Sequence, residues 1–176
     1  MGKWIKALVV LNVLVFGSIG GIWYWGSTLE SPYHAELNRY SQGTPSQIWA
    51  WLTDPDSLSK YHPEVSRIQV IDTNWYSQRW SQQHSQLGPM EMQVIKAAIP
   101  QHLVIEFIAP QSGLKGLRSV KLIPQVEGHK ITGTQIKVFE SGTWNHPLRR
   151  WWEQWVRTPD TYASLWLSHL SKKKHF

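Results

Sequence analysis

The side chains best suited to acid–base or metal chemistry in this 176-residue chain are eight histidines and twelve carboxylates, because cysteine is absent. Without cysteine the chain has no thiol nucleophile, disulfide, zinc–thiolate site or iron–sulfur site. No pair of histidines has the H-x-x-x-H spacing of a helical metal site, and no G-x-S-x-G nucleophile elbow occurs. We therefore predict no metal, no other cofactor and no catalytic residue.

Three carboxylates are better explained by structure than by chemistry. Glu91 and Glu106 lie opposite the apolar faces of two predicted strands, which is the pattern of solvated side chains. Asp54 comes at the end of a predicted helix, where its carboxylate can accept hydrogen bonds from nearby backbone amides. Enzymatic activity stays open, although a binding function is the preferred interpretation.

Aromatic and thioether side chains are the second group that could form a site. The chain has twelve tryptophans, and such large amphipathic side chains fill cores, line apolar cavities or face membrane headgroups. Polarizable methionines suit the same apolar guests. The candidate ligand-binding residues are Tyr61, His62, Trp80, Met90, Met92, Trp144, Trp151, Trp152 and Trp155. Ordinary core packing is the alternative for each of them.

The start of the chain predicts delivery to a membrane. Lys3 and Lys6 precede residues 7–25, which carry no charge and reach about 28 Å as a helix, close to the thickness of a bilayer core. Trp23, Tyr24 and Trp25 end this run, and the next basic residue is Arg39. This asymmetry predicts an inside N-terminus and a domain on the outer side.

Two other interpretations of this segment remain open. A cleavable signal peptide would also begin with a short basic region, and Ser18-Ile19-Gly20 is a small-x-small triplet after an apolar run. In that case the domain would be secreted. A buried helix of a soluble protein fits less well, because the segment is apolar on every side.

The domain organisation follows from these segments. We expect a basic N-terminus (1–6), a transmembrane anchor (7–25), a linker (26–32), one folded domain (33–171) and a basic tail (172–176). The net charge of +6 includes five basic residues in the two terminal segments, so the domain between them is nearly balanced. No clustered basic motif indicates a nucleic-acid partner. The tail could instead touch anionic headgroups or stay solvated.

Local patterns predict an ordered series of elements. Residues 33–40 alternate as a strand, and Thr44-Pro45-Ser46-Gln47 has the pattern of a capping box that starts a helix ending at Asp54-Pro55. A short helical piece is expected from Asp56 to Tyr61. Strands are then expected at 65–72, 75–82, 90–98, 102–109, 118–124 and 130–140, with a mobile connection over 110–117.

The last predicted element is a long amphipathic helix from Pro147 to about Leu170. Leu148, Trp152, Trp155, Tyr162 and Trp166 recur at helical spacing along one stripe, and Pro159 should kink or divide the helix. The sequence order is therefore one strand, two short helices, six strands and one long helix.

This order resembles the helix-grip fold of the polyketide cyclase and START-like (SRPBCC) superfamily, to which the birch pollen allergen also belongs. The helix Thr44-Pro45-Ser46-Gln47-Ile48-Trp49-Ala50-Trp51-Leu52-Thr53-Asp54 and the segment Tyr61-His62-Pro63-Glu64-Val65 look like matching parts of that superfamily. The resemblance covers roughly residues 33–171. It implies an α+β fold in which a curved antiparallel sheet of about seven strands encloses an apolar cavity against the last helix.

The superfamily includes carriers of lipids and hydrophobic ligands as well as aromatase/cyclases, so the fold alone does not decide the activity. The leading hypothesis is a single-pass, membrane-anchored protein that binds a hydrophobic small molecule or lipid without catalysis. One alternative is a cyclase- or dehydratase-like enzyme that uses the same cavity. Another is a sensor or assembly factor with a filled core. The sequence leaves ligand identity, source organism and oligomeric state open.

Overall fold

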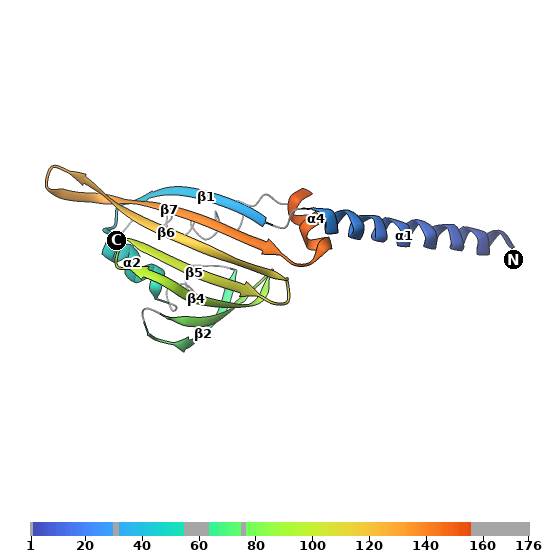
Figure 1. Cartoon of the computed structure of the whole chain (residues 1–176), viewed down its shortest axis with the longest axis horizontal. Helices are drawn as coiled ribbons and strands as arrows, with labels where there is room; N and C mark the ends of the chain where they lie inside the picture. Colours follow the sequence, from blue (N-terminus) through green and yellow to red (C-terminus); the bar gives the residue numbers. More distant parts are fainter. Residues whose placement is uncertain (1, 30–31, 55–63, 75–76, 156–176) are drawn as a thin grey trace.

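The structure is a computed structural model that describes residues 2–29, 32–54, 64–74 and 77–155. Its elements are α1 (Gly2–Thr28), β1 (Pro32–Ser41), α2 (Pro45–Thr53), β2 (Val65–Asp72), β3 (Arg79–His84), β4 (Gly88–Ala98), β5 (His102–Ala109), β6 (Leu114–Glu127), β7 (Lys130–Trp144) and α4 (Pro147–Trp155). The seven strands form one sheet, and α1 extends away from one end of it (Figure 1).

The sheet confirms the predicted fold class of a curved, antiparallel α+β domain. Its strand order is β1-β7-β6-β5-β4-β3-β2, so the first strand of the domain pairs with the last one and β1 and β2 form the two edges. Every neighbouring pair is antiparallel. A register shift between Val94 and Lys96 interrupts the β4–β5 ladder, and irregularities of this kind bend a strand and increase its twist.

Strand boundaries differ from the predicted ones where turn chemistry was misread. β6 begins at Leu114, so the predicted mobile connection over 110–117 is wrong. Gly113 has φ of +68°, which allows a short turn, and Lys115 to Leu117 then pair with β5 on one side and β7 on the other. β3 begins at Arg79 rather than at residue 75, and β7 continues past Glu140 to Trp144.

The helix α2 begins as the capping-box pattern predicts. The Gln47 backbone N–H lies 3.4 Å from Thr44 Oγ1, and the Thr44 backbone N–H donates to Gln47 Oε1 at 2.8 Å. The helix buries Ile48 and Leu52 completely and ends at Asp54. The predicted helical piece after Asp56 lies outside the described residues.

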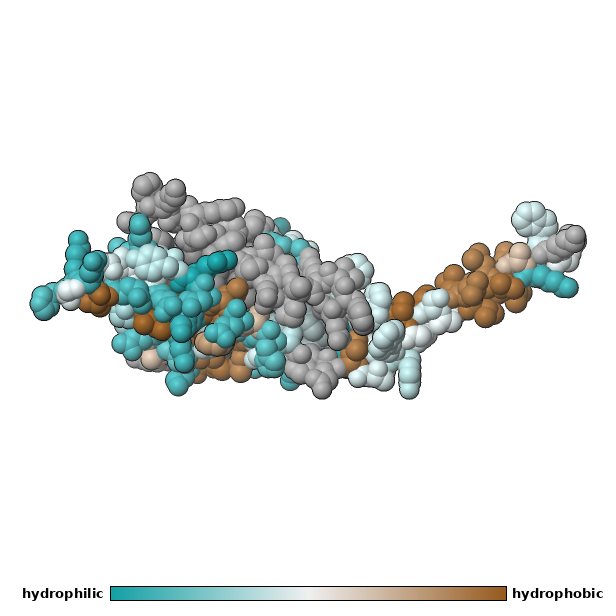
Figure 2. Space-filling model, turned by 90° about the horizontal axis from the view of Figure 1, so that it is seen from above, coloured by the Kyte–Doolittle hydropathy of each residue, from teal (hydrophilic) through white to brown (hydrophobic). Residues whose placement is uncertain are grey.

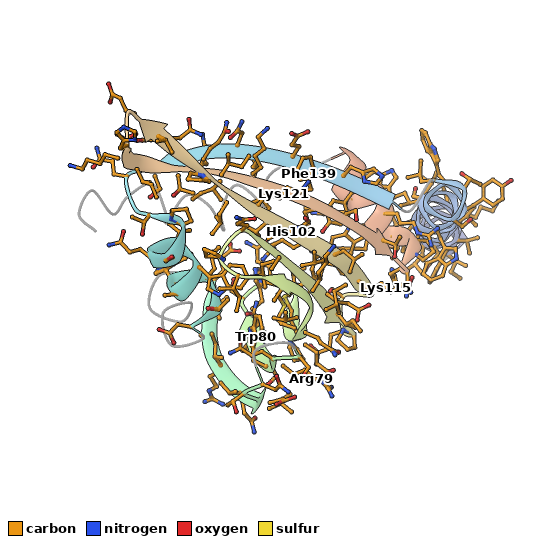
Figure 3. All side chains as sticks on the ribbon, turned by 60° about the vertical axis from the view of Figure 1, so that its left-hand side comes forward. Arg79, Trp80, His102, Lys115, Lys121 and Phe139 are labelled. Atoms are coloured by element: carbon orange, nitrogen blue, oxygen red, sulfur yellow. The ribbon has the colours of Figure 1, made fainter. Side chains whose placement is uncertain are left out.

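The hydrophobic core lies on one face of the sheet and continues into α2. Alternate positions of the central strands supply it, such as Leu103, Ile105 and Phe107 of β5, each 1–2% exposed. The other face carries the intervening side chains, and some of its large apolar residues are exposed, for example Phe139 (Figure 3). The period-two pattern therefore places one apolar face inward, as predicted.

The helix α1 is exposed almost throughout. Among the described helices it is the one long and apolar enough to cross a membrane, over Trp4–Thr28, by length and composition alone. In the view of Figure 2 the middle of α1 is strongly apolar, whereas the described residues of the domain on this face are mostly hydrophilic with apolar ones between them. A helix of this kind serves as a membrane anchor or as a signal sequence.

The helix α4 starts at Pro147 as predicted and packs mainly against α1, with a smaller contact to β7. Its described part ends at Trp155. The remainder of the predicted helix, with Tyr162 and Trp166, lies outside the described residues.

The two ends of the sheet differ in what covers them. We call the proximal end the one that carries the turn 85–88, the loop 110–113 and the junction 145–147, next to α1 and α4. The distal end carries α2, the turn 99–101 and the β6–β7 hairpin (Figure 1).

Candidate ligand-binding site

A groove of about 680 Å³ lies at the proximal end. This volume falls in the range of pockets that hold small organic ligands. Three segments far apart in the sequence form it: the turn 85–88, the loop 110–113 and the first turns of α4. The lining residues are Gln86, Leu87, Gly88, Pro110, Gln111, Ser112, Gly113, Asn145, His146, Leu148, Arg149 and Trp152.

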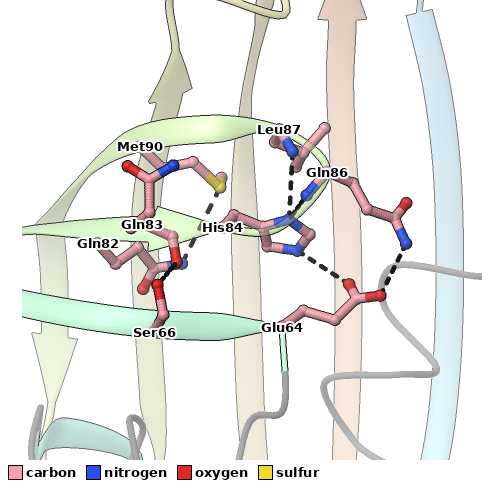
Figure 4. A network of polar contacts seen from close by, with 8 residues as sticks. All are labelled: Glu64, Ser66, Gln82, Gln83, His84, Gln86, Leu87 and Met90. Carbon is pink, nitrogen blue, oxygen red and sulfur yellow. Dashed lines mark hydrogen bonds and ion pairs between the residues drawn. The ribbon is translucent and has the colours of Figure 1, made fainter.

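The turn that forms the first wall is fixed by a buried histidine (Figure 4). His84 Nδ1 accepts hydrogen bonds from the backbone N–H groups of Gln86 at 3.2 Å and Leu87 at 3.3 Å. This assigns the proton of the neutral ring to Nε2, which lies 3.1 Å from Glu64 Oε2. The Gln86 side-chain amide donates to Glu64 Oε1 at 2.9 Å, so both carboxylate oxygens face this turn.

The second wall is joined to the third by a backbone hydrogen bond. The Asn145 N–H donates to the carbonyl of Gly113 at 2.7 Å, which links the loop 110–113 to the junction with α4. The Ser112 hydroxyl donates to the carbonyl of Ala109 at 3.1 Å and closes the same loop on itself. The Gly113 carbonyl and the Ser112 hydroxyl therefore stabilise the conformation of this loop.

Two arginines hold the α4 wall on the end of β7. The Arg150 Nε–H donates to the carbonyl of Trp144 at 2.6 Å. The Arg149 guanidinium carbon lies 5.1 Å from the centre of the Trp144 ring, which is cation–π distance. Arg149 also lines the groove, so this end combines apolar surface with a cation.

A buried polar cluster lies on the inner face of the sheet. The Arg118 Nε–H and the Tyr33 hydroxyl donate to the two carboxylate oxygens of Glu140, each at 2.7 Å. Glu140 is 3% exposed, and the Arg118 guanidinium lies 5.7 Å from the centre of the Phe107 ring. Tyr33 fits here because its ring lies against Gly142, where a Cβ would collide with it.

The structure separates the residues that the sequence singled out for the site. Trp80, Met90, Met92 and Trp144 are buried members of the hydrophobic core, and they are absent from the lining of the groove. Trp152 lines the groove and is 47% exposed, and Trp151 is half-buried in α4. Trp155 is the last described residue of α4, whereas Tyr61 and His62 lie outside the described residues.

The buried cluster was not among the predicted sites, although the sequence contains a signal for it. Glu140 follows Ile136 and Val138 at period two, and Arg118 precedes Val120 and Leu122 in the same way. Charged residues at inward positions of two strands indicate a buried ion pair. The groove had no such signal, because it is built from one turn, one loop and one helix start.

Among the described residues, no group of three or more histidine, aspartate or glutamate side chains is placed to hold a metal ion. The Glu64–His84 pair brings together one carboxylate and one imidazole, and both of its groups are engaged by the turn 85–88.

Residues 34–159 match the family described as "Polyketide cyclase / dehydrase and lipid transport", which covers more than half of the chain. The chain belongs to this family. Comparison with curated proteins finds no match.

Solved structures with the same fold include enzymes and a protein without a stated activity. Truncated norcoclaurine synthase from Thalictrum flavum has a TM-score of 0.64 at 10% identity, over 85% of this chain and 99% of that one. TTHA0849 from Thermus thermophilus has a TM-score of 0.57 at 15% identity, over 78% and 94%.

The aromatase/cyclase StfQ of the steffimycin biosynthetic pathway has a TM-score of 0.60 at 12% identity, over 80% of this chain. StfQ is a di-domain protein, and this chain spans about half of its length, 49%. At these identities the similarity establishes the helix-grip fold and nothing further about activity.

Proposed function

We propose that this protein binds a hydrophobic small molecule or lipid in the groove at the proximal end and holds or moves it at a membrane surface. The groove itself is the observation that supports this proposal. Leu148 and Trp152 give it apolar walls, and Gln111, His146 and Arg149 add polar groups at its rim. Because polar and apolar groups both line the groove, it suits an amphipathic guest whose polar end the polar groups can orient.

Burial of apolar surface would contribute to binding at about 25 cal/mol per Å², and hydrogen bonds to the polar lining groups would add to it. Leu87 lines the groove and also belongs to the hydrophobic core, so the floor of the groove adjoins the core. The groove supports ligand binding, but it lies at the end of the sheet, so the alternative of a sensor or assembly factor with a filled core stays open. No covalent step is needed for this function.

The proposal includes α1 as an uncleaved anchor. Lys3 and Lys6 on one side and the lack of basic residues before Arg39 on the other favour an inside N-terminus and a domain on the outer side. Cleavage of α1 as a signal sequence is the alternative. Sequencing the N-terminus of the protein from isolated membranes decides between them, because a cleaved chain would lack residues 1–20.

The binding test uses the full chain in nanodiscs with a fluorescent fatty acid as the probe. We expect saturable binding, and Trp152→Ala should weaken it about tenfold, or ~1.4 kcal/mol, because the indole forms part of the apolar wall. Phe139→Ala is the matched control, since this exposed aromatic residue lies on the opposite face of the sheet. Absence of saturable binding, or equal loss in both variants, would contradict the proposal.

The buried cluster favours a second candidate, a cyclase- or dehydratase-like enzyme. Glu140, Tyr33 and Arg118 are ionisable groups on the inner face of the sheet, which this alternative requires. Tyr33→Phe keeps the ion pair and removes one hydroxyl. If the protein is an enzyme, mass spectrometry of a membrane lipid extract should show products of cyclisation or water loss with the unmodified protein and far fewer with Tyr33→Phe.

A further inference from the structure

The proximal end of the domain is attached to the end of α1 by direct side-chain and backbone packing. The rings of Trp23 and His146 meet edge to face, with centroids 5.2 Å apart and an interplanar angle of 83°. One turn further along α1, Gly26 lies against the backbone of Pro147, and a Cβ at Gly26 would collide with the Pro147 carbonyl. The start of α4 is therefore fixed relative to α1 (Figure 1).

The same residues that contact α1 also form one wall of the groove. His146 contacts Trp23 and lines the groove, and Leu148 and Arg149 follow it on the first turn of α4. The hydrogen bond from Asn145 to Gly113 extends this connection to the loop 110–113. The groove is thus held at the level of the last two turns of α1.

That level corresponds to the headgroup layer if α1 crosses a bilayer. The apolar span runs over Trp4–Thr28, and Trp23 lies near its end, where indole rings favour the interface. One helical turn rises about 5.4 Å, so Gly26 and the start of α4 lie within about one turn of Trp23. A groove attached there faces lipid headgroups rather than bulk water.

The charges of the described residues at this end agree with such a location. Arg149 and Arg150 lie on the first turns of α4, and exposed Lys115 follows the loop 110–113 (Figure 3). Glu64 at the same end is engaged by His84 and Gln86. Basic side chains close to an anionic bilayer surface are attracted to it.

We propose that the proximal end docks on the bilayer surface, so that the groove opens directly onto the leaflet beside α1 and exchanges an amphipathic, lipid-like ligand with it. This inference rests on the proposed function, because it requires α1 to remain as an anchor. Beyond the proposed function, it names a lipid surface as the partner of the groove. It also states that the ligand moves between groove and leaflet without passing through water. It also explains why α4 packs on α1 rather than mainly on the sheet.

The first experiment measures the position of both ends of the sheet relative to the lipid. Since the chain has no cysteine, Gln111→Cys and His129→Cys each give one labelling site, at the proximal loop and at the distal hairpin. The full chain carries a fluorophore in nanodiscs that contain phosphatidylcholine with a nitroxide on its headgroup. We expect several-fold stronger quenching at residue 111 than at residue 129.

Equal quenching at the two positions, or stronger quenching at 129, would overturn the inference. This result is independent of ligand binding. If residue 111 is quenched and the fluorescent fatty acid does not bind, docking stands and the proposed function fails. If the fatty acid binds and residue 111 is not quenched, the proposed function stands and docking fails.

The second experiment breaks the attachment itself. Gly26→Leu places a side chain where Pro147 lies, whereas Gly20→Leu adds the same side chain where nothing lies within 4 Å. The fluorophore at residue 111 should be quenched more strongly than the one at residue 129. We expect Gly26→Leu, introduced together with Gln111→Cys, to remove at least half of this difference. Gly20→Leu should leave it unchanged. Unchanged quenching in Gly26→Leu would show that the packing of α1 on α4 does not set the position of the groove.

Discussion

The proximal and distal ends of one sheet are closed in opposite ways. At the distal end, Ile48 and Leu52 of α2 are fully buried in the hydrophobic core. The Thr134 hydroxyl donates to the Gly43 carbonyl at 2.7 Å and fixes the segment before this helix. At the proximal end, short segments held by polar contacts surround a groove of about 680 Å³. In the described part of the fold, the apolar side chains of α2 therefore close the distal end, whereas the polar contacts of short segments leave a groove at the proximal end.

The inner face of the sheet also differs between its distal and proximal halves. The distal half of β7 places Ile136 and Val138 inward, whereas the proximal half places Glu140 there with Arg118 and Tyr33. Burial of charges is costly unless they are paired and hydrogen-bonded, and these two hydrogen bonds satisfy both oxygens of Glu140. The proximal half of the described core therefore holds the buried ion pair, whereas the buried polar groups of the distal half, such as Thr134, are uncharged.

The largest expected effect comes from breaking this ion pair. Glu140→Gln should lower the free energy of unfolding by about 3–5 kcal/mol, because it removes the charge that balances the buried Arg118. Glu91→Gln is the control, since Glu91 is exposed and lies 4.0 Å from exposed Arg79, a contact worth about 0–1 kcal/mol. Urea unfolding measures both. If both variants lowered the free energy of unfolding by a similar small amount, Glu140 would not form a buried ion pair with Arg118.

The second effect compares the two closures directly. Leu52→Ala at the distal end should cost about 2–5 kcal/mol of unfolding free energy, since the side chain is 1% exposed and leaves a cavity. Leu148→Ala at the proximal end should cost less than about 1.5 kcal/mol, because this half-buried side chain faces the groove. The two variants are compared by urea unfolding. Equal losses would show that the proximal end is packed as a core.

The third effect tests how the α4 wall is held. Arg150→Met removes the hydrogen bond to the Trp144 carbonyl and should lower the free energy of unfolding by only about 1–2 kcal/mol. Hydrogen exchange over residues 147–155 should become faster, while exchange in α2 stays unchanged. Uniformly faster exchange over both ends would show a global rather than a local role for this contact.

The smallest effect concerns the distal end and depends on pH. Burial lowers the pKa of His102 below its ordinary value of 6.5, and the nearby positive charges of Lys96 and Lys121 lower it further. The unfolded chain therefore takes up this proton at a higher pH than the folded chain. Stability from this group is present above about pH 6.5 and is lost as the pH falls toward the lowered pKa.

Replacing the group isolates this contribution. His102→Gln should make the free energy of unfolding less sensitive to pH between 7 and 5, roughly the range where an ordinary histidine titrates. Urea unfolding at several pH values measures the slopes of the two proteins. Equal slopes would show that His102 does not titrate differently in the folded and unfolded chains. The hydrogen bond between His102 Nε2 and Ser119 Oγ, 2.9 Å long, should be kept in part by glutamine.

The fold was largely predictable because its signals are local. The capping box at Thr44 starts α2, and the period-two strands at 65–72 and 102–109 appear with their predicted boundaries. The boundary of β6 was not predictable in the same way. Leu114 to Leu117 become a strand only because β5 and β7 lie on either side to pair with them.

The site was less predictable, since no single segment contains it. Trp80, Met90 and Met92 have the residue types of a ligand pocket, yet they pack in the core because their strand positions face inward. Among the predicted residues whose side chains the structure describes, Trp152 is the one that lines the groove. Its neighbours there come from the turn 85–88 and the loop 110–113, which have ordinary turn sequences.

The sequence by itself determined the order of the described strands, the start of α2 and of α4, and the presence of an apolar helix at the start of the chain. These properties depend on side chains within a few residues of one another, through helical and strand periodicity. Only the tertiary structure decided that Glu140 meets Arg118 and Tyr33, and that α4 packs against Trp23 and Gly26. These contacts join residues separated by more than twenty positions in the sequence. Such residues come together only when whole strands and helices pack against one another.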